Sequence, residues 1–248
     1  MKLEKSEAIV LQTFRARERD KLVVFLTAAH GKKRGWAYGA RSLRTRFGAT
    51  LEPLSKILIG YAERESEEVV RIESVDLIRS LFDVHRNLES SMTATWIAEL
   101  IDTFAPADEP SELLFRLADR ITEGLASGLR PLAVLAWSDV WILKVAGIFP
   151  STRNCISCHA PLGRPMRFDA TAGGFVCEGC AERSVPVMAN ALADSLAALL
   201  RLPLDEFARL PLPAEELFEL RSIAGGLRRS FLGHELKSHD LLAAVLTS

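Results

Sequence analysis

The feature that most constrains the fold is the placement of four cysteines, the only cysteines among 248 residues. They form two Cys-x-x-Cys pairs, Cys155 with Cys158 and Cys177 with Cys180, separated by eighteen residues. Two residues between thiolates let one tight turn present both sulfurs to one ion, and a second such turn completes a tetrahedron. We therefore predict one structural zinc ion per chain, held by these four residues in a loop at residues 155–180.

Other interpretations of the pairs are two disulfides, a redox-active pair or a cluster of inert thiols. Residues 1–6 are charged and lack the apolar segment of a signal peptide, which favours a reducing, cytoplasmic compartment. His159 could replace a cysteine, but four thiolates already complete a tetrahedral site, so we expect a solvated loop histidine. Because such a site has no open position for water or substrate, it indicates a folding clamp and not a reaction centre.

The composition, 48% hydrophobic and 25% charged, is typical of a soluble globular chain, and the length favours two domains. The longest apolar stretch, residues 131–150, contains Ser138, Asp139 and Lys144 and therefore predicts a buried helix instead of a membrane span.

The net charge of −1 conceals an asymmetry along the chain. Residues 1–50 carry twelve basic and four acidic residues, a balance of +8, so the remainder carries −9. This division indicates a basic face that meets a polyanion and an acidic body that does not.

Five short β-type segments occupy the first part of the chain, at residues 8–14, 21–27, 35–40, 51–61 and 68–75. Turn signals separate them, including His30-Gly31 and residues 64–66. Five strands in so short a span predict an OB-fold barrel over residues 1–77, with an SH3-like barrel as the alternative.

Beyond residue 77 the hydrophobic period changes to that of helices, so we expect a mostly α-helical domain at residues 78–248 that carries the cysteine loop. The fold class is therefore α+β with two domains. Ser90 or Ser91 could cap the first helix, which ends before Pro106. A second helix is predicted to start at Pro110-Ser111-Glu112, with Gly124 and Gly128 at its end. The remaining predicted helices span residues 131–147, 190–201, 214–231 and 239–246.

A basic cluster lies between Gly31 and Thr50 with no acidic residue among its members, which are Lys32, Lys33, Arg34, Arg41, Arg44 and Arg46. Trp36, Tyr38 and Phe47 are interleaved with these cations. Cations that follow the phosphates and aromatic rings that stack on bases are typical of single-stranded nucleic-acid sites. The alternatives are that the charges form a solvated surface and that the rings fill the barrel.

The sequence contains no Walker-type phosphate loop, no GxSxG, no HExxH and no GxGxxG between a strand and a helix. Its five histidines are scattered. We therefore expect a DNA-binding protein that is not an enzyme. The rival interpretations are a zinc-containing nuclease or transferase and a structural adaptor without DNA contact.

The order of these features resembles the RecO family of bacterial DNA repair and recombination mediators. The similar segments are residues 8–11, 20–23, 27–32, 38–41 and 51–53, the Cys-x-x-Cys pairs with Phe168 and Gly173-Gly174 between them, and Leu236-Lys237-Ser238. The chain departs from the family pattern at His159, where glycine often follows the second cysteine, and at His239, where arginine often follows the Lys-Ser pair.

The resemblance implies an N-terminal OB domain, a zinc-containing helical domain, binding to single- and double-stranded DNA, and annealing of complementary strands. It also implies two protein partners, a RecR-type protein and the tail of the single-stranded-DNA-binding protein. We expect the protein to be a monomer when alone and to lie in the cytoplasm near the nucleoid. The resemblance and the apolar helices lead us to expect a groove for that acidic, hydrophobic-ended tail, with a basic rim drawn from Arg116, Arg120 and Arg130.

Overall fold

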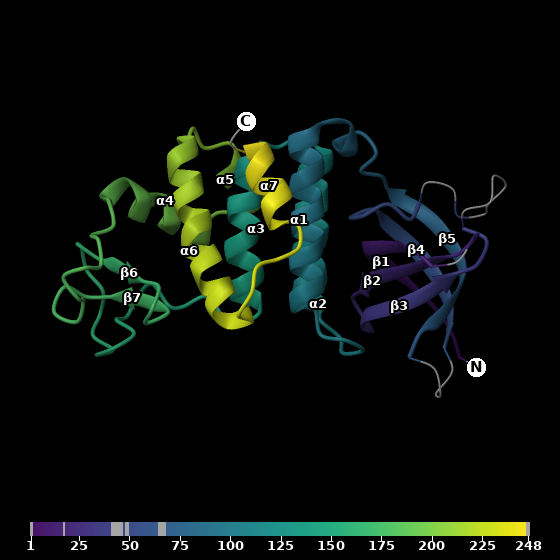
Figure 1. The fold of residues 1–248 in the computed structure, drawn as a ribbon, viewed down its shortest axis with the longest axis horizontal. Coiled ribbons are helices and arrows are strands. Elements are labelled where there is room, and N and C mark those ends of the chain that lie inside the picture. Colours follow the sequence, from purple (N-terminus) through teal and green to yellow (C-terminus); the bar gives the residue numbers. More distant parts are fainter. Residues whose placement is uncertain (1, 17, 41–46, 48–49, 64–67, 247–248) are drawn as a thin grey trace. The chain divides into compact units, whose positions relative to one another are not determined.

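The computed structural model describes residues 2–16, 18–40, 47, 50–63 and 68–246 (Figure 1). The chain divides into two compact units. The first, here called the barrel unit, comprises Met1–Pro131 and Leu236–Ser248, and the second, called the cysteine unit, comprises Leu132–Glu235. No helix within the described ranges has both the length and the apolar character needed to cross a membrane.

The barrel unit begins with five strands that close into a barrel in the order β1-β2-β3-β5-β4. The strands are β1 (Lys2–Arg15), β2 (Lys21–Thr27), β3 (Gly31–Ala37), β4 (Lys56–Glu63) and β5 (Val70–Arg79). Neighbours pair antiparallel except β3 and β5, which are parallel at Gly35 and Trp36. Alternate residues of each strand point inward and form an apolar core that includes Val10, Phe25, Ile59 and Tyr61. This is the five-stranded OB-type barrel that the sequence predicts.

Some strand boundaries differ from the prediction. β3 begins at Gly31 instead of residue 35. The run of basic residues before residue 35 lacks the apolar alternation of a strand, and Lys33 is buried only because it forms ion pairs. β4 begins at Lys56 instead of residue 51, since the chain turns through Leu54, whose φ is +61°. β2 has the predicted bounds.

The helices of the barrel unit are α1 (Leu88–Phe104), α2 (Glu112–Ala126) and α7 (His239–Leu246), preceded by a short 3-10 helix, η1 (Val84–Arg86). The predicted caps of α1, Ser90 and Ser91, are wrong: Asn87 is the N-cap, and its side chain accepts a 2.9 Å hydrogen bond from the amide of Ser90. Gly124 lies inside α2, and the chain leaves the helix near Gly128, whose φ is +76°. α7 packs against α1 (Figure 1).

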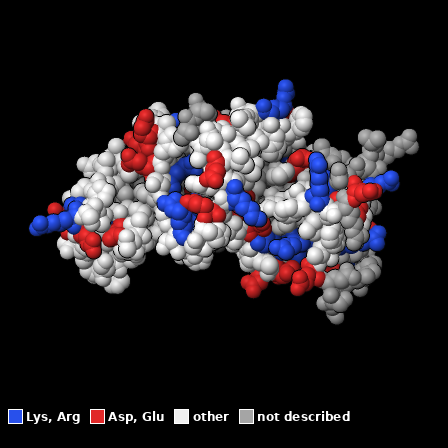
Figure 2. Space-filling view, viewed as in Figure 1, with Lys and Arg blue, Asp and Glu red and all other residues white. Residues whose placement is uncertain are grey.

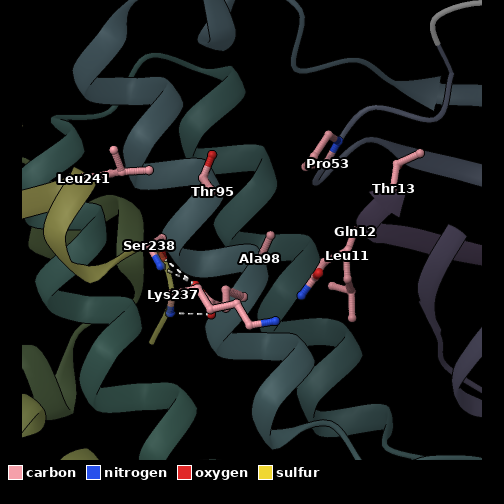
Figure 3. Close-up of a pocket in the computed structure, with 10 residues that line it drawn as sticks. Leu11, Gln12, Thr13, Pro53, Thr95, Ala98, Lys237, Ser238 and Leu241 are labelled. Carbon is pink, nitrogen blue, oxygen red and sulfur yellow. Dashed lines mark hydrogen bonds between the residues drawn. The ribbon is translucent and has the colours of Figure 1, made fainter. Parts of the chain in front are cut away.

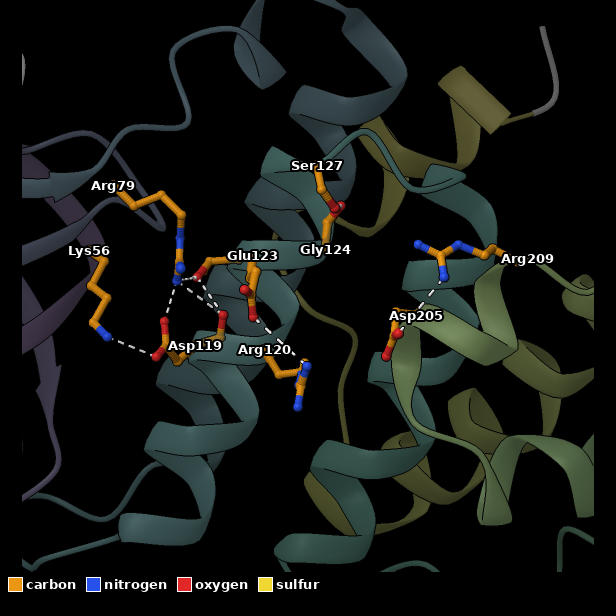
Figure 4. Close-up of polar contacts among 10 residues, drawn as sticks. Lys56, Arg79, Asp119, Arg120, Glu123, Gly124, Ser127, Asp205 and Arg209 are labelled. Carbon is orange, nitrogen blue, oxygen red and sulfur yellow. Dashed lines mark hydrogen bonds and ion pairs between the residues drawn. The ribbon is translucent and has the colours of Figure 1, made fainter.

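An ion-pair network joins the barrel to α2 (Figure 4). Lys56 of β4 places its Nζ 2.8 Å from Asp119 and 2.9 Å from Glu7, and Arg79 of β5 also donates to the Asp119 carboxylate. Burial raises the pKa of Asp119, but hydrogen bonds from Lys56 and Arg79 outweigh it and lower that pKa below its ordinary value. The charged form of Asp119 is therefore the one that holds β4 and β5 on α2.

The cysteine unit is built on α3 (Pro131–Val145), which is buried over most of its circumference as predicted. The other elements are β6 (Arg167–Asp169), β7 (Gly174–Val176), α4 (Asn190–Arg201), α5 (Leu204–Ala208) and α6 (Ala214–Leu232). Trp137 and Trp141 of α3 donate indole hydrogen bonds to the carbonyls of Leu202 and Leu199. α5 was not predicted, because five residues are too few to establish a period.

The predicted boundary near residue 77 corresponds to the change from strands to helices, which falls between Arg79 and Val84. The compact units group the elements differently, since α1, α2 and α7 belong with the barrel.

Candidate nucleic-acid interface and metal centre

The basic cluster is split between a strand and residues outside the described ranges. Lys32, Lys33 and Arg34 lie on β3, whereas Arg41, Arg44 and Arg46 fall outside the described part of the chain. Among the three on β3, Arg34 is exposed, Lys32 is half-buried and Lys33 is buried. Arg34 is therefore the described member of the cluster that is best placed to meet an external anion.

Lys33 carries its charge under the surface, between two carboxylates. Its Nζ lies 2.7 Å from Glu63 and 2.9 Å from Asp108, and 8% of its side chain is exposed. Burial lowers the pKa of Lys33, but the hydrogen bonds to Asp108 and Glu63 outweigh burial and raise the pKa above its ordinary value. The absence of acids in the local sequence is thus compensated by acids from distant segments.

Lys32 is held by the last turn of α1 and by the segment that links α1 to α2. Its Nζ lies 3.1 Å from Asp102, and its backbone amide donates to the carbonyl of Pro106. The amide of Asp108 in turn donates to the carbonyl of Lys32, so the linker adds main-chain pairing to the edge of β3. At Gly31, a Cβ would lie 2.0 Å from the carbonyl oxygen of Glu109, and φ is +64°, so glycine alone permits this approach.

The surface of the barrel consequently carries both signs of charge. Figure 2 shows Lys and Arg beside Asp and Glu over the barrel on the face that it presents. A mixed surface attracts a polyanion less strongly at long range than a field of one sign, so local contacts by individual arginines matter more.

The three aromatic residues interleaved with the basic cluster differ in how far they are exposed. Phe47 is 1% exposed and belongs to the barrel core, as the alternative interpretation holds. Trp36 is half-buried, whereas Tyr38 is 42% exposed. Their rings stack with centroids 6.5 Å apart and planes inclined by 25°.

The four cysteines converge in the cysteine unit. Their sulfur atoms all lie within 4.8 Å of one another, and the sulfurs of Cys158 and Cys177 are 3.7 Å apart. A tetrahedron with metal–sulfur bonds of about 2.3 Å has edges of about 3.8 Å, so the observed spacing fits a single metal ion. A disulfide would bring two sulfurs to about 2.05 Å, and all four cysteines are free thiols here.

Tight turns present the sulfurs in the manner that the spacing predicts. The amide of His159 donates to the carbonyl of Cys155, and the amides of Cys180 and Ala181 donate to that of Cys177. His159 itself is exposed, and the group of possible ligands consists of the four cysteines. Its φ of +60° lies in the left-handed region that favours glycine.

The electrostatics of the cluster favour thiolate at its buried member. Backbone hydrogen bonds from Cys158 and Cys177 lower the pKa of Cys155 to about 6. Hydrogen bonding with Cys158 and Cys177 instead raises the pKa of Cys180 to about 12. Four sulfurs this close repel one another as thiolates, and a central dication is the partner that compensates them.

A small hairpin packs beside the cluster. β6 and β7 pair antiparallel with Phe168 opposite Phe175. Phe175 is fully buried, its ring lies 5.3 Å from that of Phe168, and its carbonyl accepts from the amide of Ile156 between the first two cysteines. The hairpin thus connects the cysteine turns to the apolar interior of this unit.

The arginines predicted for a partner tail lie on or just after α2. Arg116 is 3.9 Å from Glu112, and Arg120 is 3.9 Å from Glu123, in each case with both side chains more than half exposed. Arg130 is exposed in the turn before α3. Such exposed pairs contribute little to stability and leave the guanidinium groups accessible.

A cavity of about 320 Å³ lies in the barrel unit, between β1, α1 and the start of α7 (Figure 3). Leu11, Pro53, Ala98 and Leu241 contribute apolar surface, and Lys237, two residues before α7, also lines the cavity. No local sequence pattern indicates this cavity, because its walls come from four segments far apart in the chain.

Comparison with known families matches nearly the whole chain. A model described as Recombination protein O N terminal matches residues 1–81, and a model described as Recombination protein O C terminal matches residues 85–240.

Individual curated proteins agree with these matches. The DNA repair protein RecO of Koribacter versatilis (strain Ellin345) is 34% identical over 222 residues, which cover 88% of this chain and 89% of that protein. The protein of the same name from Myxococcus xanthus (strain DK1622) is 34% identical over 249 residues and 96% of each chain. That of Anaeromyxobacter sp. (strain K) is also 34% identical, over 97% of this chain and 96% of the relative.

Proposed function

The chain belongs to the recombination protein O family, whose role lies in DNA repair and recombination, and from this membership we propose that it binds single- and double-stranded DNA and anneals complementary strands. The observation that carries the proposal is the barrel itself. Its exposed Arg34 belongs to the stretch between Gly31 and Thr50, which contains six basic residues and no acid. Small closed barrels of this type commonly bind nucleic-acid strands on their outer face.

The proposed phosphate contacts start from Arg34 and extend to Arg41, Arg44 and Arg46. Lys32 and Lys33 already pair with carboxylates, so they reach a phosphate only where these acids release them. Contacts to phosphate do not depend on base identity, which suits a protein that must act on any damaged sequence.

The proposed cellular role is that of a mediator in the cytoplasm, near the nucleoid. With a RecR-type partner, the protein would help to load a recombinase on strands coated by single-stranded-DNA-binding protein. We propose that it acts as a monomer before it meets these partners.

We propose that Cys155, Cys158, Cys177 and Cys180 hold one zinc ion per chain. Support comes from the sulfur spacing and from the all-thiolate donor set, which zinc prefers at structural sites. Bound zinc would supply folding energy to the turns and the hairpin. With four protein ligands it would have no open position for a substrate, so we propose no enzymatic activity.

For the tail of the single-stranded-DNA-binding protein we propose a contact with Arg116, Arg120 and Arg130. A fluorescent tail peptide should bind the native protein and lose affinity when all three are replaced by alanine. Replacement of Lys237 by alanine serves as the comparison, because it tests the cavity of Figure 3 instead. An affinity that only the Lys237 variant lowers would move the site to that cavity.

The test of the proposed function is an annealing assay with two complementary labelled strands. The native protein should accelerate duplex formation, also on strands coated with single-stranded-DNA-binding protein. The labelled DNA should remain full-length after incubation with Mg²⁺. Cleaved DNA would support the nuclease alternative, and failure to bind DNA at any salt concentration would support the adaptor alternative.

A further inference from the structure

Strand pairing aligns four side chains in one row across the outer surface of the barrel. Phe14 of β1 is opposite Leu22 of β2, Leu22 is opposite Trp36 of β3, and Trp36 is opposite Arg71 of β5. Residues directly opposite each other in a sheet project to the same face. These four residues are here called the outer row.

The outer row points away from the core. Phe14 is 45% exposed and Arg71 has an exposed side chain, whereas the next residues along the strands, Val23, Ala37 and Ile72, are buried in the core. The alternation of a strand therefore accounts for the outward direction of the row. The aromatic side chains in it are not needed to fill the barrel.

Tyr38 extends the row by a stacked assembly. Its ring stacks on that of Trp36, and the Arg71 guanidinium lies 5.6 Å from the centroid of the Tyr38 ring. Arg71 also pairs with Glu73 at 2.9 Å, which fixes the guanidinium without covering the exposed ring of Tyr38. A ring whose orientation is fixed by an aromatic neighbour and a cation, and which keeps part of its surface exposed, is a preorganised surface for another planar group.

The cations that accompany the row indicate what that planar group is. Arg34 lies two residues before Trp36 and therefore on the same face of β3, and Arg71, a member of the row itself, is also exposed. Aromatic faces between exposed cations match the alternation of bases and phosphates in a single strand. In a duplex the bases are already stacked on one another and do not offer their faces.

We propose that the outer row and Tyr38 bind the bases of single-stranded nucleic acid by stacking, while Arg34 binds its phosphates. This inference rests on the proposed DNA-binding function and adds to it the means by which single strands are distinguished from duplex. It assigns base contacts to Phe14 and Tyr38, and a supporting contact to Arg71.

The experiment compares two ligands of equal length and charge, a mixed-sequence single strand and an abasic strand, at one salt concentration. The native protein should prefer the strand that has bases. Tyr38→Ala should weaken binding to it by roughly 5- to 150-fold, the range of one lost stack, and leave binding to the abasic strand unchanged. Tyr38→Phe, which keeps the ring, should retain the preference. Phe14→Ala should act like Tyr38→Ala.

Phe82→Ala is the matched control, since Phe82 is 63% exposed and lies outside the row. The salt dependence of binding should be the same in Tyr38→Ala as in the native protein, because stacking releases no counterions. Circular dichroism verifies that each variant is folded. If Tyr38→Ala lost affinity equally for both strands, or for neither, the inference would be overturned while the proposed function stands. A loss for neither strand would indicate that the outer row binds a protein surface instead of bases. If the native protein binds neither strand, the proposed function fails and the inference fails with it.

Discussion

The ammonium group of Lys33 lies 2.9 Å from the carboxylate of Asp108, a residue 75 positions later in the chain. Asp108 belongs to the linker that pairs with the edge of β3, and its φ is +58°. A carboxylate of this linker therefore pairs with one cation of the cluster to which we assign DNA binding. The competition between this carboxylate and a phosphate is open to measurement.

We predict that Asp108→Asn strengthens binding to single-stranded DNA. The change leaves Lys33 with one carboxylate partner, Glu63, and makes its charge more available to a phosphate. The log-log salt slope should become steeper by up to about 0.7, the value for one additional phosphate contact on a single strand. Glu109→Gln is the control, because it removes the same charge from the neighbouring exposed position. Identical effects of the two variants would mean that Lys33 is not involved.

Asp119→Asn should destabilise the barrel unit by roughly 1–3 kcal/mol at neutral pH, because Lys56 and Arg79 lose the carboxylate that holds them. Urea denaturation of the variant and the native protein measures the difference. Glu123→Gln, also on α2 and more than half exposed, should change stability by less than about 0.5 kcal/mol.

The pH dependence of that difference follows from the sign of the pKa shift. The pKa of Asp119 is lower in the folded protein than its ordinary value of 3.8, so the folded state binds the proton more weakly than the unfolded state. The stabilising contribution is thus complete above the ordinary carboxylate pKa and is lost as the pH falls through the lowered value. In acid the native protein and Asp119→Asn should become more alike, and a difference that grows in acid would contradict this assignment.

Metal content tests the cysteine cluster. Native protein purified without chelator should contain about one zinc ion per chain, and Cys177→Ser should lower both metal content and thermal stability. His159→Gly should keep the metal, since His159 is exposed and its left-handed backbone suits glycine. Native protein with well under one equivalent of metal, together with an unchanged melting temperature in Cys177→Ser, would rule out a structural zinc site.

Glu99 of α1 fastens the beginning of α7. Its carboxylate accepts hydrogen bonds from the amides of Lys237 and Ser238, at 2.7 and 2.9 Å, and from the Ser238 hydroxyl at 2.6 Å (Figure 3). Glu99→Ala should therefore speed hydrogen exchange of the α7 amides and cost roughly 1–2 kcal/mol. Glu123→Ala on α2 is the comparison, and equal exchange in both variants would show that the contact does not hold α7.

Features with a local signature could be predicted from the sequence. The Cys-x-x-Cys pairs indicate a metal site because each pair of ligands lies within four consecutive residues. β2, α4 and α7 have the predicted bounds because their hydrophobic patterns are regular. The OB-type barrel followed from the number and spacing of its strands. The RecO resemblance was confirmed by the family matches.

Features built from distant segments could not be predicted. The burial of Lys33 depends on Glu63 and Asp108, which no periodicity connects to β3. The separate fates of Phe47 and Tyr38 depend on strand ends and turns, where alternation no longer tells inside from outside. The outer row likewise requires the register of four strands, and that register is a property of the closed barrel.

The central claim, that the basic cluster on the barrel holds DNA, is tested most directly by the salt dependence of single-strand binding in Arg41→Glu/Arg44→Glu/Arg46→Glu. The control is Arg183→Glu/Arg201→Glu/Arg209→Glu, which reverses three exposed arginines of the cysteine unit. The first variant should bind more weakly at every sequence, with a log-log slope flatter by about 0.7 for each lost phosphate contact, and the control should match the native protein. A native slope in the first variant, with circular dichroism proving it folded, would contradict the account and place the DNA site elsewhere.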